Sequence, residues 1–178
     1  MMKPFFFLTA LAFLLLLPAG LSAQKIEVEK RVSPEKAPAL MQQFLREKYP
    51  EKRRVKYYEE RNESGRFFEA KFCFEQARYS VKFTPEGQLV DTERKVKFRQ
   101  LPAHLSEQIN RQLSEQFQRY KVVKTQEMLE GGRVVGYELE VKGKKGGELG
   151  YFEGQFDAQG RQQGLRAREQ PPNDFLFF

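Results

Sequence analysis

Tryptophan is absent from this 178-residue chain, and cysteine and histidine occur once each. Because Cys73 is the only thiol, an intramolecular disulfide is excluded, and its place in the alternating segment "EAKFCFEQ" indicates a small packed side chain. His104 alone cannot form a zinc site of ordinary composition, and no Gly-x-Ser-x-Gly elbow offers a nucleophile for a Ser-His-Asp set. The sequence therefore predicts a protein that is not an enzyme, with no catalytic residue, no metal site and no cofactor.

Phosphate and calcium motifs are also missing. The glycine-rich runs "EGGRVVG" and "KGKKGGELG" are followed by strand patterns, which favours hairpin turns over a phosphate-binding loop. Acidic pairs such as Glu59–Glu60 and Glu138/Glu140 lack the spacing of a calcium loop. They are typical of a solvated strand face.

Long apolar runs are absent except at the start. Lys3 precedes the uncharged run Phe5 to Leu17, and "LSA" comes directly before Gln24. This pattern predicts a secretory signal peptide, residues 1–23, cleaved after Ala23. The run is shorter than the roughly 20 apolar residues of a membrane-spanning helix. We expect an exported protein, periplasmic or secreted, with no membrane span after cleavage.

The charge balance is basic, with a formal net charge of +7 and a pI near 9.5. Residues 1–23 carry one Lys and no acid, so +6 remains after cleavage (7 − 1). Such a balance favours acidic partners, although the bases are scattered among 24 acids, as on an ordinary mixed surface. Because most Phe residues alternate inward and the chain is exported, we expect no nucleic-acid partner.

Two stretches space their apolar residues as helices do. In "SPEKAPALMQQFLREKYP", Ser33 and Pro34 form a start signal and Pro50 an end signal. The apolar positions of this stretch are Ala37, Met41, Phe44, Leu45 and Tyr49. In "PAHLSEQINRQLSEQFQRY" they are Leu105, Ile109, Leu113 and Phe117. Each pattern predicts one amphipathic helix.

Alternating polar and apolar residues follow each helix. After the first, the strand candidates are residues 53–60, 66–76, 78–83 and 88–98; after the second, they are 120–128, 133–143, 148–160 and 161–169. A period of two with one mostly apolar face predicts antiparallel strands covered on one side, in each case by the preceding helix.

The order of one helix and four strands thus occurs twice. Phe83 and Gly87 of "VKFTPEGQLV" recur as Phe156 and Gly160 of "GQFDAQGRQQ". We therefore predict an α+β fold, a tandem repeat of one helix packed on a four-stranded antiparallel sheet. Its units are residues 24–100 and 101–170, which should share an interface or join their sheets edge to edge, since units this small are marginal alone. The apolar tail, residues 171–178 with "FLFF" at its end, is expected to dock rather than stay exposed.

These paired segments resemble the PepSY-like family of exported bacterial proteins, which is related in fold to the beta-lactamase-inhibitor protein. The resemblance covers about residues 33–168 and is carried by "SPEKAPALMQQFLREKYP" with "VKFTPEGQLV" and by "LPAHLSEQINRQLSEQF" with "GQFDAQGRQQ". The chain departs from the family in having no Trp near the final strand. The resemblance implies a binding module of the cell envelope that docks to or inhibits another protein, with no catalytic residues to carry over.

Our first hypothesis is accordingly an exported binding module that presents an open sheet face to a protein or peptide partner. The residues expected to bind the partner are Tyr58, Lys71, Lys82, Glu138 and Tyr151. The alternative is a carrier or sensor of a small apolar or anionic ligand held between helix and sheet, which requires an internal cavity.

Overall fold

The computed structural model describes residues 28–168, which form nine strands and two helices. The strands are β1 (Val28–Val32), β2 (Arg53–Asn62), β3 (Gly65–Phe74), β4 (Ala77–Phe83), β5 (Leu89–Val96), β6 (Arg119–Glu130), β7 (Arg133–Lys145), β8 (Glu148–Asp157) and β9 (Gln162–Arg168). The helices are α1 (Ala39–Lys48) and α2 (Ala103–Gln116), preceded by the short 3₁₀ helices η1 (Pro34–Lys36) and η2 (Phe98–Gln100). The predicted signal peptide and the apolar tail lie outside the described residues.

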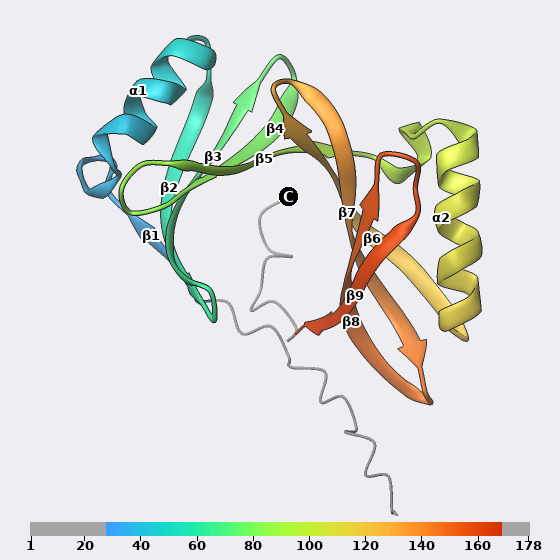
Figure 1. Ribbon diagram of the computed structural model, residues 1–178. Helices are drawn as coiled ribbons and strands as arrows, with labels where there is room; N and C mark the ends of the chain where they lie inside the picture. Colours follow the sequence, from blue (N-terminus) through green and yellow to red (C-terminus); the bar gives the residue numbers. More distant parts are fainter. Residues whose placement is uncertain (1–27, 169–178) are drawn as a thin grey trace, which may run out of the picture.

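All nine strands belong to one antiparallel sheet, in which each strand pairs with its neighbours in the sequence (Figure 1). The predicted fold class is therefore wrong. The strands do not form two four-stranded sheets, because β5 pairs directly with β6, with Glu93 opposite Met128 and Val96 opposite Thr125. The fold is mainly β, and it does not support the internal-repeat interpretation. The physical reason is that an unpaired strand edge exposes backbone N–H and C=O groups, which the β5–β6 ladder satisfies.

The apolar patterns of the two helices are confirmed. Met41 and Leu45 of α1 are fully buried in a cluster with residues of β3 and β4, among them Phe72 and Val81. Ile109, Leu113 and neighbouring residues of α2 are buried likewise against β7 and β8 in a second cluster, which includes Leu139, Val141 and Phe156. Burial of each such side chain contributes about 2 kcal/mol, so the helices are held by their packing on the sheet.

The start of the first helix differs from the prediction. Ser33 and Pro34 begin only the 3₁₀ helix, and α1 starts after Pro38. A proline disfavours the helical conformation of the residue before it, and Ala37 is extended with ψ of 143°. The second helix begins at Ala103 after Pro102, as expected.

Both helices cover the same face of the sheet. Tyr79 of the first cluster lies directly opposite Arg94 on β5. Arg94 lies opposite Glu127 on β6, and Glu127 lies opposite Tyr137 of the second cluster. Because directly opposed residues share a face, the two clusters are on one side. Figure 1 shows α1 and α2 on the outside of a bent sheet, with its other face turned inward.

Candidate functional site

The sheet face turned away from α1 and α2 is here called the open face. Its side chains alternate along each strand with those of the two apolar clusters, as Lys71 does with Ala70 and Phe72, and Glu138 with Tyr137 and Leu139. Its charged and aromatic members include Glu29, Tyr58, Glu60, Glu69, Lys71, Lys82, Asp91, Glu93, Lys124, Glu138, Lys142, Tyr151 and Glu153. The open face is therefore an extended polar surface on the inside of the bend.

All five residues predicted to bind a partner lie on the open face, but not as one cluster. Tyr58, Lys71 and Lys82 lie on the adjacent strands β2, β3 and β4. Glu138 and Tyr151 lie on β7 and β8, with β5 and β6 between the two groups. Their role in binding remains a prediction, now divided between two parts of the same surface.

In the first group, the lysines pair with carboxylates. The Lys71 ammonium lies 3.1 Å from Glu69, pairs also with Glu29, and stands 4.9 Å from the ring centroid of Tyr58. Lys82 lies 2.8 Å from Glu60. Positive charge in this half of the open face is thus neutralised within the sheet itself.

Buried carboxylates are the feature that sequence reasoning missed. Glu60, Glu69 and Glu153 are only 1%, 7% and 3% exposed. The interpretation of Glu59–Glu60 as a solvated pair is wrong for Glu60, because Lys82 and Asn62 both donate to its carboxylate. A signal was available: open-face bases occur on the strand next to Glu69 (Lys82) and next to Glu153 (Arg168), and two strands away from Glu60 (Lys82). Using it required the strand register, which the sequence did not give.

Glu69 and Glu29 share one electrostatic environment. Burial opposes the charge of Glu69, but Lys71, hydrogen bonds with Glu29 and Ser80, and Lys82 outweigh it and lower its pKa to about 2. Burial, together with the hydrogen bond to Glu69, raises the pKa of Glu29 to about 7. Below about pH 7 the pair therefore retains a proton on Glu29, which donates to the Glu69 carboxylate.

Glu93, near the middle of the open face, is the second carboxyl group that holds a proton near neutral pH. Burial, followed by repulsion from Glu138, raises its pKa to about 8, although Lys124 acts in the opposite direction. The amide of Gln126 donates a hydrogen bond to its carboxyl oxygen. The central part of the open face is consequently less negative than its count of acids suggests.

The far end of the open face, on β6 to β8, has a different character. Lys121 lies directly opposite Lys142, and Arg119 lies directly opposite Lys144. Tyr151 is opposite Lys142, whose ammonium stands 5.5 Å from the centroid of its ring. Here cations face cations around one aromatic side chain.

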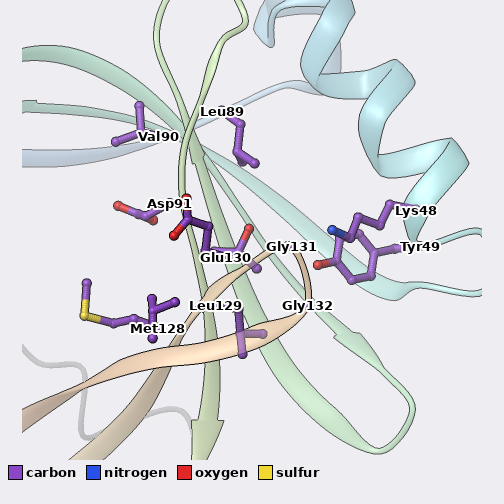
Figure 2. A pocket seen from close by; sticks show the side chains of 12 residues that line it. Lys48, Tyr49, Leu89, Val90, Asp91, Met128, Leu129, Glu130, Gly131 and Gly132 are labelled. Atoms are coloured by element: carbon purple, nitrogen blue, oxygen red, sulfur yellow. The ribbon is translucent and has the colours of Figure 1, made fainter. Parts of the chain in front are cut away.

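A separate hollow of about 330 Å³ lies where the end of α1, the start of β5 and the β6–β7 turn come together (Figure 2). Tyr49 and Lys48 stand on one side of it, and Gly131 and Gly132 of the turn stand on another. Its lining also includes the exposed aliphatic side chains Leu89, Val90 and Val135. Its polar lining comes from Lys48, Tyr49, Asp91, Thr92 and Glu130, and none of the predicted binding residues lines it.

The residues with metal-binding or nucleophilic side chains are scattered. Within residues 28–168, no three His, Cys, Asp or Glu side chains are grouped so as to hold a metal ion. His104 is exposed in the first turn of α2, and Cys73 is a partly buried free thiol on β3. No helix in this part of the chain is long and apolar enough to cross a membrane.

Comparison with known proteins supports the fold alone. No protein-family model and no curated protein matches the chain. A DUF2874 family protein from Bacteroides ovatus is similar in structure, with a TM-score of 0.56, 15% identity, and coverage of 74% of this chain and 87% of its own. A protein from Bacteroides eggerthii, provisionally described as periplasmic, is also similar, with a TM-score of 0.55, 15% identity, and coverage of 74% of this chain and 88% of its own. A BLIP-like protein from Bacteroides fragilis has a TM-score of 0.54 and 14% identity, with coverage of 77% of this chain and 90% of its own.

These likenesses concern the fold. The chain has a BLIP-like fold, similar to that of the Bacteroides fragilis protein. The PepSY-like part of the sequence resemblance is not shown.

Proposed function

We propose that this chain is an exported, non-enzymatic binding module that engages a protein or peptide partner through the open face. The observation that carries the proposal is that both helices pack on one face of the bent sheet, which leaves an extended face of fixed charges on the other. Salt bridges and hydrogen bonds hold many of these side chains in place, so little conformational entropy is lost when a partner docks.

The fold likeness is consistent with this function. The Bacteroides fragilis protein is described as BLIP-like, and the Bacteroides eggerthii protein provisionally as periplasmic. Together with the predicted signal peptide, they support a location in the periplasm or outside the cell. The absence of enzymatic activity is part of the proposal, supported by the position of the only histidine, which is exposed on α2, on the helix side of the sheet.

The alternative of a small ligand held between helix and sheet has less support. Met41 and Leu45 are fully buried between α1 and the sheet, and Ile109 and Leu113 are fully buried beneath α2. These side chains occupy the space that such a ligand would need. A carrier function would therefore require displacement of core side chains.

Site-specific photocrosslinking tests the proposal. A photoreactive amino acid replaces either Glu138 on the open face or Arg111, exposed on α2, and the chain from residue 24 onward is incubated with envelope extract. We expect a discrete crosslinked protein from position 138 and none from position 111. Crosslinks from the helix side only, or none from either position, would overturn the function proposed for the open face.

A further inference from the structure

The cations at the far end of the open face lie where they destabilise the sheet. Lys121 and Lys142 are directly opposed on β6 and β7, and so are Arg119 and Lys144. Tyr120, Val122 and Val141 alternate with these cations along β6 and β7 and belong to the second apolar cluster or pack against it, so the four cations share the open face. Like charges directly opposite each other destabilise a sheet. This arrangement therefore needs a reason other than folding.

Internal acids do not neutralise this end. Within residues 28–168, none of these four cations forms an ion pair, whereas Lys71 and Lys82 in the other half each pair with a carboxylate. The nearby Glu153, which is buried, pairs with Arg168 at 3.2 Å. The positive charge of Arg119, Lys121, Lys142 and Lys144, which we call the basic end, is thus available to a partner.

Apolar surface accompanies this charge. Tyr151 lies beside the Lys142 ammonium, and Leu149, which is 61% exposed, lies directly opposite Lys144. A half-buried tyrosine and an exposed leucine between cations suit a peptide that carries both carboxylates and apolar side chains. An anionic lipid surface is the competing occupant, and vesicles are therefore among the probes of the test below.

From this geometry we propose that the basic end is a docking site for an acidic peptide segment of the partner, with Lys121, Lys142 and Tyr151 at its centre. The inference rests on the proposed function and narrows it. It assigns recognition to β6, β7 and β8, and it assigns to the ion-paired half on β2 to β4 the structural role of holding the face in shape.

Fluorescence anisotropy with defined probes tests the site. The chain from residue 24 onward is titrated against a short labelled peptide rich in Glu and Asp that contains one Phe and one Leu. A peptide with Lys in place of each acid, vesicles containing anionic phospholipid, and a single-stranded DNA oligomer serve as comparison probes. We expect the acidic peptide to bind, with an affinity that falls as salt rises. Stronger binding of the vesicles, the DNA or the basic peptide would overturn the proposal.

A pair of matched double variants locates the binding. Lys121→Gln with Lys142→Gln removes two charges from the basic end, whereas Arg99→Gln with Arg111→Gln removes two exposed charges on the helix side. We expect the first variant to lose at least about tenfold in affinity for the acidic peptide, and the second to bind as the parent does. If both variants lost affinity equally, the net charge of the chain would explain the binding, and the proposed site would be wrong.

Thermal unfolding tests whether misfolding explains a loss of affinity in the first variant. Because the first variant removes a repulsive pair, its Tm should equal or exceed that of the parent chain, and a large fall in Tm would contradict the assignment of these lysines. If the peptide does not bind but position 138 gives a crosslinked partner, only this inference is contradicted. If both experiments fail, the proposed function is contradicted as well.

Discussion

The ammonium of Lys82 on β4 lies 2.8 Å from a carboxylate oxygen of Glu60 on β2, although β3 separates the two strands. The lysine reaches across Phe67, whose ring centroid is 6.0 Å from its nitrogen. Glu60 is 1% exposed and also accepts a hydrogen bond from Asn62. A buried carboxylate is thus held by a long side chain from the next strand but one.

Replacement of this lysine should therefore be costly. We expect Lys82→Met to lower the free energy of unfolding by about 3 kcal/mol, because it leaves the buried Glu60 without its cation. Urea denaturation measures the change. The double variant Lys82→Met with Glu60→Gln should recover much of the loss, since no charge then remains to be buried. A single variant as stable as the parent would show that the ion pair contributes nothing.

The stability of the fold should depend on the ionisation of Glu93. Its pKa is about 8 in the folded chain against an ordinary value of 4.5, so between these pH values the folded state holds a proton that the unfolded state has lost. The contribution of this group is present below about pH 4.5 and is lost as pH rises through about 8.

Glu93→Gln should accordingly make the chain more stable at pH 9, relative to the parent, than it does at pH 5. We expect a difference on the order of 2 kcal/mol, less than the full shift would give, because a partly exposed carboxylate is screened. Chemical denaturation at both pH values measures it. Glu107→Gln, at an exposed position on α2, is the control and should change neither value. An identical pH dependence in parent and Glu93→Gln chains would refute the assignment.

Gly136 on β7 should not tolerate a side chain. A Cβ atom there would lie 2.6 Å from the backbone carbonyl oxygen of Phe156 on β8, which cannot move aside without disturbing the ladder. We expect Gly136→Ala to cost about 1–3 kcal/mol, seen as a lower Tm. Gly164→Ala on β9 is the matched control, since nothing described lies within 4 Å of the added atom. Equal Tm values for the two variants would argue against the close approach of β7 and β8.

Thr125 on β6 offers a stabilising substitution. It is 2% exposed, and within the described residues its hydroxyl has no hydrogen-bond partner. Thr125→Val keeps the shape and removes the buried polar atom, so we expect a gain of about 1 kcal/mol in the free energy of unfolding. Thr92→Val is the comparison. The Thr92 side chain is hydrogen-bonded to Tyr49, so we expect this variant to be less stable than the parent chain. A loss at Thr125 as large as that at Thr92 would rule out the idea.

Local patterns predicted the elements well. The alternation in "RFFEAKFCFEQ" located β3, and the spacing of Leu105, Ile109 and Leu113 located the buried side of α2. These features depend on residues close in the chain, which the periods of helix and strand fix. The same alternation placed Tyr58, Lys71 and Lys82 on one face before their neighbours were known.

The arrangement of the elements was not predictable in the same way. Nothing in the residues around Glu93 and Met128 specifies that β5 and β6 pair, so the sequence left open whether the two predicted units share an interface or join their sheets edge to edge. The prediction of a tandem repeat of four-stranded sheets is wrong, because this pairing makes all the strands one sheet. The burial of Glu60 also depends on the register of three strands, which sets whether Lys82 reaches it.

What the amino-acid order alone determined is the alternation of side chains along each strand and around each helix, because these periods are properties of the backbone. Only the tertiary structure decided that the strands join into one bent sheet and that the acids of its first half meet their bases. It also left the cations of the basic end facing one another. Pairing between distant strands is chosen by the free energy of the whole sheet, and no short segment contains that information.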